Sequence, residues 1–174
     1  MHAAEIVDRL ERGGVIFASL VAGLDRPRLL HRPDEKTWSI LEILRHLGDE
    51  EEFDFRPRLE RTLDESRPSW DPIDPTGWAA ARRYRDADAG EALARFQTLR
   101  ASSVAWLRGV TAGAPDWSRA YQHPRLGPIR AGDLLASWAA HDALHIRQIA
   151  KRLFELAAID APGFSTRYAG EWGA

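Results

Sequence analysis

Cysteine is absent from the 174 residues of the chain. Disulfide bonds, thiolate nucleophiles and cysteine-ligated zinc sites are therefore excluded, and any thiol in the chemistry of the protein has to come from a bound small molecule. A chain without cysteine also fits a reducing, intracellular compartment.

The chain also lacks an excess of positive charge and long apolar runs. The chain carries 24 lysines and arginines against 26 aspartates and glutamates, so it lacks the basic field that nucleic-acid binding requires. No apolar run approaches the roughly 18 residues of a membrane-spanning helix, and residues 1–12 lack the features of a signal peptide. We therefore expect no nucleic-acid partner, no membrane association and a cytoplasmic location.

What the chain does contain is typical of a globular protein. Hydrophobic residues make up 44% and charged residues 29% of the sequence, which argues against extended disorder. A chain of this length can bury one good core but not two. We expect a single domain over residues 1–174.

Apolar residues recur at helical spacing in four stretches of the chain. These stretches are residues 3–24, 40–63, 88–112 and 131–156. Ser39 and Glu42 form a capping-box pattern at the start of the second stretch, and Asp88 with Glu91 marks the start of the third. Pro57 is expected to kink or break the second helix, because proline lacks a backbone donor and clashes with the preceding turn.

The segments outside these helices complete the expected fold. Residues 64–88 hold three prolines and two tryptophans, which predicts a long connection with one short helical turn near residues 78–85. Residues 161–174 are rich in glycine and aromatic residues, and we expect them to pack as a coil on the bundle. No strand pattern competes with the helices, so the predicted fold is an all-α four-helix bundle with a long connection between its second and third helices.

The stretch W-A-A-H-D-A-L-H-I-R-Q-I, residues 138–149, places two histidines one helical turn apart. His141 and His145 are separated by four positions, so both imidazoles lie on the same face of the fourth helix. A metal site with an open position needs about three protein ligands. His46 is the candidate third ligand, because it is the other histidine on a predicted helix beside an apolar face. From spacing alone, the same residues are equally compatible with partly buried histidines that bind no metal.

Three neutral imidazoles with no evident fourth protein ligand describe a site with exchangeable water positions. A divalent metal in such a site lowers the pKa of a bound water or thiol and provides a nucleophile near neutral pH. Zinc, nickel, iron and manganese all accept imidazole ligands, so the sequence leaves the identity of the metal open.

Three polar residues near these histidines are further candidates. Glu50 lies one turn beyond His46 and could act as a general base or a positioning partner, although a charge run such as residues 49–54 usually forms the solvated face of a helix. Asp142 lies within the apolar arc of the fourth helix, so it needs a partner such as a helix N-terminus, an indole or a histidine. Gln148 lies further along the histidine face and could orient a neighbouring group.

Three segments together resemble the DinB-like superfamily, which includes the YfiT-type proteins. They are W-S-I-L-E-I-L-R-H-L around His46, E-A-L-A-R-F-Q-T-L-R-A-S-S-V-A-W-L in the third helix, and H-P-R-L-G-P-I-R followed by H-D-A-L-H-I-R-Q-I. The resemblance implies an up-down-down-up four-helix bundle, a divalent metal held by His46, His141 and His145, and a homodimer. Pro57 and Arg130 depart from the pattern of the family, within the second helix and at the start of the fourth.

Family members with known activity include thiol S-transferases that use low-molecular-weight bacterial thiols, an isomerase and metal-dependent hydrolases. By this resemblance the chain is a metal-dependent enzyme in which an activated thiol or water attacks a small electrophilic substrate, as a thiol S-transferase or a hydrolase, and Glu50 is the candidate catalytic base. The alternative is a non-enzymatic stress protein that binds a metal or a small ligand. A third hypothesis is a structural or interaction bundle whose histidines are incidental.

Overall fold

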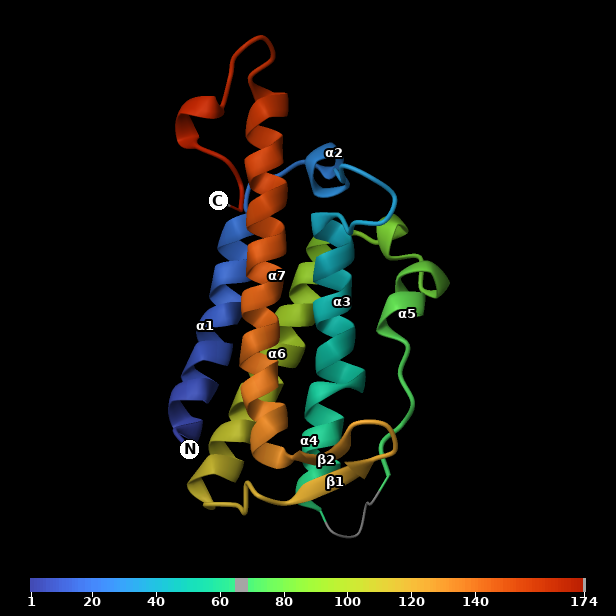
Figure 1. Cartoon of the computed structure of the whole chain (residues 1–174), viewed down its shortest axis with the longest axis vertical. Coiled ribbons are helices and arrows are strands. Elements are labelled where there is room, and N and C mark those ends of the chain that lie inside the picture. Colours follow the sequence, from blue (N-terminus) through green and yellow to red (C-terminus); the bar gives the residue numbers. More distant parts are fainter. Residues whose placement is uncertain (65–68, 174) are drawn as a thin grey trace.

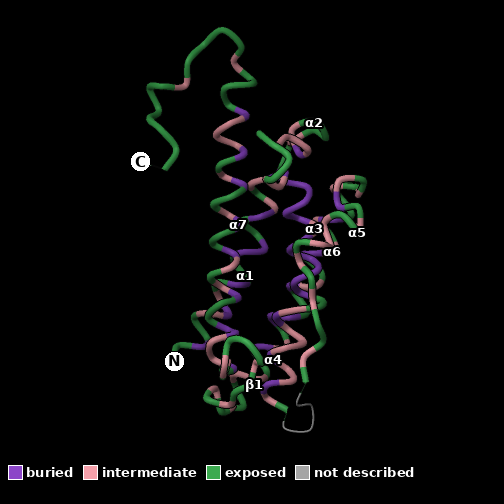
Figure 2. Tube along the Cα trace, turned by 45° about the vertical axis from the view of Figure 1, so that its right-hand side comes forward, coloured by how far each residue is buried: buried purple, intermediate pink, exposed green. Residues whose placement is uncertain are grey.

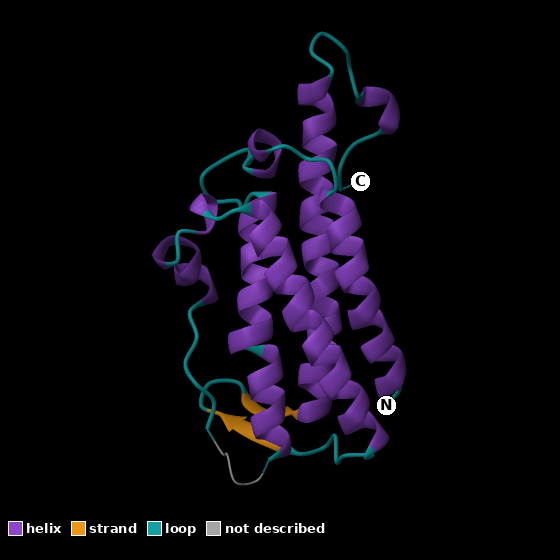
Figure 3. Ribbon diagram, turned by 180° about the vertical axis from the view of Figure 1, so that it is seen from behind, coloured by secondary structure: helices purple, strands orange, loops and turns teal. Residues whose placement is uncertain are grey.

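Four long helices form the body of the computed structural model, which describes residues 1–64 and 69–173. They are α1 (Ala3–Val21), α3 (Ile40–Phe53) with its continuation α4 (Phe55–Leu63), α6 (Ala89–Ala112) and α7 (Ala131–Asp160). α1 and α7 run in one direction and α3 and α6 in the other, which is the predicted up-down-down-up arrangement (Figure 1). From behind, the helices stand side by side above a small sheet at one end (Figure 3). None of the described helices is long and apolar enough to cross a membrane.

The second and third long helices begin where the sequence places capping residues. Ser39 Oγ accepts a hydrogen bond from the Glu42 backbone N–H at 3.4 Å, and the Glu42 carboxylate accepts one from the Ser39 backbone N–H at 2.9 Å. Asp88 caps α6 by accepting from the Glu91 N–H at 2.9 Å. These bonds satisfy donors that a helix start leaves unpaired, and they confirm both predicted starts.

The predicted break in the second helix occurs at Asp54, where φ is −120° and ψ is −88°. Pro57 then occupies the third position of α4, so its missing N–H is one of the donors that lack an intrahelical partner in any case. α4 continues below α3 toward the small sheet (Figure 1). The break therefore leaves the bundle intact, and it brings Asp54 into contact with Glu50 and Arg58.

A β-hairpin that the sequence analysis did not predict precedes α7. β1 (Ala120–His123) pairs antiparallel with β2 (Gly127–Arg130). Gly127 has a φ of +75°, and a left-handed residue at the end of a three-residue loop is a common way to close a hairpin. Each strand has only four residues, which is too short for an alternating pattern to stand out. The all-helical expectation is therefore wrong for this segment, although the bundle is as predicted.

The fourth long helix starts directly after the hairpin, without a capping hydroxyl. The Asp133 carboxylate accepts from the Arg130 backbone N–H at 3.0 Å and pairs with the Arg130 guanidinium at 2.8 Å. This pair restrains the first turn of α7 and accommodates the arginine that departs from the family pattern. At its other end α7 reaches Asp160, one turn beyond the predicted end.

Short helices occupy the connections between the long ones. They are α2 (Arg26–Leu29), α5 (Pro75–Ala81) and the 3-10 helices η1 (Tyr84–Asp86) and η2 (Arg167–Ala169). α5 and η1 lie against α3, and they fall where the sequence predicts a helical turn. Residues 65–68 of the predicted long connection, and Ala174, lie outside the described residues.

The C-terminal segment leaves the bundle instead of packing on it (Figure 1). Phe164 is 82% exposed and Tyr168 is fully exposed. Trp172 contacts Phe154 of α7, with ring centroids 5.6 Å apart. The expectation of a packed coil is wrong except at this contact, because the last turns of α7 carry the chain past the end of the core.

The apolar core is divided into two clusters along the bundle axis, and buried positions line the inner faces of the helices (Figure 2). The cluster near the start of α3 includes Phe17, Leu44, Phe96 and Ile149. The cluster near the hairpin includes Leu10, Leu59, Leu107 and Trp138. Every long helix passes from one cluster to the other, and the crossing contains buried polar residues on α3, α6 and α7. The three histidines singled out from the sequence lie in this polar layer.

Candidate metal centre

The three predicted histidines meet in the layer between the two core clusters. His141 Nε2 lies 3.0 Å from His145 Nε2 and 3.3 Å from His46 Nε2, and one ligand atom from each residue lies within 4.8 Å of the other two. Two nitrogens bound to one metal at about 2.0–2.1 Å, at an angle of roughly 90–109°, are about 2.9–3.4 Å apart. The observed separations fit this range, so the donor set can accommodate a divalent metal.

Aromatic side chains form the walls of the site. The indole of Trp38 lies 4.7 Å from the His46 ring, centroid to centroid, and is nearly parallel to the His145 ring at 6.5 Å. The Phe55 ring meets the His141 ring edge-on at 5.1 Å. These contacts restrict the orientations of the imidazoles and exclude water from the protein side of the cluster.

Burial keeps all three imidazoles neutral. Desolvation lowers the pKa of His46 to about 3, that of His141 to about 2 and that of His145 to about 4. Repulsion from a protonated His145 adds to the shift at the other two rings, and the hydrogen bond that Gln148 accepts from His145 opposes the shift at His145. Metal ligation requires neutral imidazole, so near pH 7 no proton has to be displaced.

The Nδ1 atoms of two of these rings face oxygen acceptors. Gln148 Oε1 lies 2.8 Å from His145 Nδ1, so it can accept the Nδ1 proton and leave Nε2 available as a ligand. His46 Nδ1 lies 3.6 Å from Glu50 Oε1, and neither atom has a hydrogen-bond partner among the described residues. Ligation through His46 Nε2 would place a proton on Nδ1, directly opposite this free oxygen. The sequence suggests that Gln148 orients a neighbouring group, and in the structure this group is His145.

Glu50 is buried and interacts with a second carboxyl group. Burial raises the pKa of Glu50 well above its usual range, and the negative charge of Asp54 raises it further. Burial also raises the pKa of Asp54, while the Arg58 guanidinium at 2.9 Å favours its ionised form. Glu50 therefore holds a proton that it donates to Asp54. The interpretation of residues 49–54 as a solvated helix face is wrong for residues 49–51, because these residues are almost completely buried.

Asp142, next to His141 in the chain, is held by Arg100 of α6. Two nitrogens of Arg100 contact the two oxygens of Asp142 at 2.5 and 2.8 Å, and its Nε donates to Glu51 Oε1 at 2.7 Å. Trp138 Nε1 donates to the same Glu51 oxygen at 2.9 Å. Desolvation opposes the charge on Arg100, but the Asp142 hydrogen bond and the Glu51 charge outweigh it and raise the pKa of Arg100. Asp142 therefore has a partner, as predicted, but this partner is an arginine and not one of the suggested groups.

The sequence analysis did not identify two residues of this layer, Arg100 and Trp38. Arg100 lies four positions after Phe96 and four before Val104, both of which are buried. A charged residue on an apolar helical stripe is a signal of a buried ion pair. Trp38 directly precedes the helix cap Ser39, a position from which apolar side chains commonly pack on the first turns of a helix.

Comparison with protein families agrees with this arrangement. The model of the DinB superfamily matches residues 9–149, a range that includes all three histidines and both acidic partners of Arg100. The chain belongs to the DinB superfamily. Among curated proteins, no sequence matches it.

The DinB-superfamily bundle also resembles a solved structure, that of YfiT from Bacillus subtilis. The TM-score is 0.78 and the sequence identity 22%, and the match covers 89% of this chain and 87% of that chain. YfiT is described as a probable metal-dependent hydrolase with an unusual four-helix bundle topology. At this identity the likeness shows the fold, and it confirms the four-helix bundle predicted from the sequence.

Proposed function

We propose that this DinB-superfamily protein is a metal-dependent enzyme that binds one divalent cation through Nε2 of His46, His141 and His145. The observation that carries the proposal is the convergence of three neutral, largely buried imidazoles on one point. Three protein ligands leave positions for water and substrate, which is typical of catalytic sites, whereas structural sites are closed by a fourth ligand. The likeness to YfiT supports a hydrolytic reaction.

A divalent metal at this site would supply a Lewis acid that lowers the pKa of water or of a thiol. The protein's own contribution is to hold the ligands in one tautomer and one orientation. Gln148 accepts the Nδ1 proton of His145, and the ring of Trp38 restricts both His46 and His145. Such fixed ligands reduce the reorganisation that accompanies the reaction.

Glu50 is a positioning residue in this proposal, although the sequence predicts it as a general base. Its Oε1 atom lies at Nδ1 of His46, on the opposite edge of the ring from Nε2. Because its proton goes to Asp54, Oε1 remains free to accept the Nδ1–H of His46. Glu50 thus acts through the ligand, and this geometry supports orientation of His46 better than proton abstraction from a substrate.

The nucleophile distinguishes two versions of the reaction. Water gives a hydrolase. A thiol gives a thiol S-transferase, and because the chain has no cysteine, that thiol would be a second, low-molecular-weight substrate. In both versions the substrate is a small electrophilic molecule, and we retain the predicted homodimer and cytoplasmic location as parts of the proposal.

The metal ligands are tested by replacing His141 with alanine. We expect metal content to fall from one ion per chain to near zero, together with any turnover, because two imidazoles do not retain a divalent metal against dilution. The measurement is elemental analysis of protein purified without a metal-affinity tag. His2→Ala is the matched control, since its side chain is 85% exposed and lies outside the site. Full metal occupancy in His141→Ala would contradict the assignment.

The alternatives are separated by turnover. The metal-loaded protein is assayed with a panel of esters, amides and alkylating electrophiles, each with and without an added thiol. Turnover in water alone indicates a hydrolase, and thiol-dependent turnover a transferase. Stoichiometric metal without turnover on any substrate favours the non-enzymatic binding protein, and no stoichiometric metal after reconstitution favours incidental histidines.

A further inference from the structure

A pocket of about 360 Å³ lies beside the three histidines. Two of its lining residues also contact them: Trp38 packs on His46, and Gln148 bonds to His145. The other lining residues are Lys36, Thr37, Thr76 and Arg152. The volume falls within the range of small-molecule sites. The pocket and the histidine cluster therefore share two residues, Trp38 and Gln148, and lie next to each other.

The lining of this pocket is suited to an anion. Each of the six lining residues carries a side-chain hydrogen-bond donor, and two of them, Lys36 and Arg152, are cationic. Among the residues that the structure describes, no carboxylate lines the pocket. Hydrogen bonds from charged donors to an anion are about twice as strong as neutral ones, so an anionic group gains more here than a neutral one.

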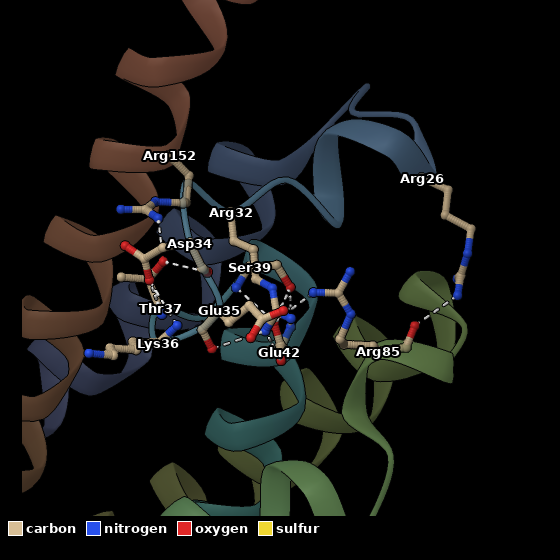
Figure 4. A network of polar contacts seen from close by, with 10 residues as sticks. All are labelled: Arg26, Arg32, Asp34, Glu35, Lys36, Thr37, Ser39, Glu42, Arg85 and Arg152. Carbon is tan, nitrogen blue, oxygen red and sulfur yellow. Dashed lines mark hydrogen bonds and ion pairs between the residues drawn. The ribbon is translucent and has the colours of Figure 1, made fainter.

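Arg152 is the central feature of the lining. It is only 4% exposed, and it reaches from α7 to the turn that carries Asp34, Lys36 and Thr37 (Figure 4). Its Nη1 donates to Thr37 Oγ1 at 3.3 Å, and its Nε pairs with Glu155 Oε2 at 3.1 Å. Nη2 makes no hydrogen bond to any residue in the described part of the chain. A nearly buried guanidinium therefore keeps donors available for a ligand.

The charges around Arg152 favour a monoanion. Glu155 pairs with Arg152, and the pKa of Asp34 is lowered mainly by the hydrogen bond from the Lys36 backbone N–H, with a smaller effect of the Arg152 charge. Asp34 Oδ1 is already engaged by the backbone N–H groups of Lys36 and Thr37. Asp34 and Glu155, which lie outside the pocket, thus offset the charges of the two cationic residues that line it. Too little positive charge remains for a dianion such as phosphate. The planar fork of arginine matches a carboxylate.

The spacing along α7 sets the size of the ligand. His141, His145, Gln148 and Arg152 are four, three and four positions apart, so they lie on one face of the helix. From His145 to Arg152 is seven residues, which is about 10 Å along the axis, and helical side chains lean toward the N-terminus, here toward the histidines. A molecule bridging both groups spans roughly four to seven carbon atoms.

We infer that this pocket binds the carboxylate of a small-molecule substrate whose reacting group lies at the three histidines, with Arg152 and Lys36 as the carboxylate ligands. The inference rests on the proposed function for the position of the reacting group. It adds a substrate class, aliphatic carboxylates with an electrophilic or thiol-bearing end, that the histidines alone do not specify.

The inference is tested with ω-mercapto carboxylates on the zinc-loaded protein, because their thiol can bind the metal while the carboxylate reaches the pocket. The matched probes are ω-mercapto alcohols of the same length, and binding is measured by calorimetry. We expect each acid of four to seven carbons to bind roughly tenfold or more tightly than its alcohol, the effect of one charge-assisted pair. Arg152→Gln should remove this preference. Arg147→Gln, an exposed neighbour on the same helix, should retain it.

Equal binding of acid and alcohol by the wild-type protein would overturn the inference, as would an undiminished preference in Arg152→Gln. Because Arg152 is buried, its replacement can also unfold the protein, so Lys36→Gln at the exposed rim provides a second variant. We expect it to reduce the preference about two- to fivefold, in line with a partly exposed ion pair, and an unchanged preference there would exclude Lys36 from the site.

Failure of the proposed metal site can be distinguished from failure of the carboxylate site. If the wild-type protein takes up no zinc, the proposed function fails and the pocket is examined alone, by NMR titration of the metal-free, nitrogen-15-labelled protein with hexanoate and hexan-1-ol. Shifts of the Trp38 indole and Gln148 amide signals with hexanoate but not with hexanol would support the carboxylate site. No shift with hexanoate, or equal shifts with both, would refute it.

Discussion

Gln148 fixes which nitrogen of His145 is available to a metal. Its Oε1 atom lies 2.8 Å from His145 Nδ1, and loss of such a partner typically lowers metal affinity 10- to 100-fold. We expect Gln148→Leu to weaken metal binding by about this factor while leaving the fold intact, because the side chain is largely exposed. Competition with a metal chelator measures the change. Gln122→Leu, at an exposed position of the hairpin, is the control, and equal affinities of the two variants would remove Gln148 from the site.

Arg100 is the residue on which the polar layer depends most. It neutralises Glu51 and Asp142 while being 3% exposed itself. Removing one member of a buried charge network leaves the others unpaired, so we expect Arg100→Met to lower the free energy of unfolding by about 3–5 kcal/mol. Urea denaturation measures this change.

Two variants show whether the cost of Arg100→Met comes from the unpaired acids. The triple variant Glu51→Gln, Arg100→Met, Asp142→Asn should recover part of the lost stability, because the remaining groups are then neutral. Arg108→Met, further along α6, removes two exposed ion pairs to α1 and should change little. If the triple variant is no more stable than the single one, lost packing accounts for the effect of Arg100→Met.

At the scale of one helix, the start of α3 determines where His46 and Trp38 are placed. Ser39 is fully buried, and its hydroxyl both accepts from the Glu42 N–H and donates to the Glu42 carboxylate. We expect Ser39→Ala to cost about 1 kcal/mol of unfolding free energy, measured by urea denaturation. Ser19→Ala, an exposed serine within α1, should be close to neutral. A similar loss at both positions would argue against a specific capping effect.

The elements that the sequence predicts correctly are those with a local cause. Ser39, Asp88 and Pro57 act on backbone groups within four residues, so two helix starts and one helix break follow from the sequence alone. The hairpin and the C-terminal segment depend on weaker or longer-range effects. A four-residue strand has almost no period to detect, and the exposure of the tail depends on how far α7 extends beyond its neighbours.

The three histidines of the candidate site were predictable, and their surroundings were predictable only in part. Two histidines four positions apart must share a helical face, and the family-like order of segments adds His46. Glu50 and Gln148, one turn beyond His46 and His145, follow from the same helical spacing. The pairing of Arg100 with Asp142 depends instead on packing between helices distant in the sequence. Residues 49–54 look like a solvated run because a charge pattern does not reveal that Arg100 pairs with Glu51 and that Tyr84 donates a hydrogen bond to Asp49.

The groups of this layer make the stability of the whole molecule depend on pH in two opposite ways. The site histidines have lowered pKa values in the folded state, so the unfolded chain binds more protons below about pH 6.5, and stability decreases as the pH falls. Glu50 has a raised pKa, so its contribution is present at low pH and is lost as the pH rises. The total slope therefore mixes both effects, and only a comparison between variants isolates the histidines.

The comparison uses metal-free wild-type protein and His141→Ala, unfolded by urea at pH 7.5 and at pH 5. The pKa of His141 is about 2 in the folded state and 6.5 in the unfolded chain. At pH 5 His141 is therefore protonated only in the unfolded chain, which costs about 2 kcal/mol of stability. At pH 7.5 this cost is almost zero. We therefore expect the wild-type protein to lose about 2 kcal/mol more than His141→Ala between these pH values. The exposed His2→Ala variant should follow the wild type. Equal pH slopes for wild type and His141→Ala would mean that His141 takes up its proton in the folded state, and the site would then bind metal only in competition with protons.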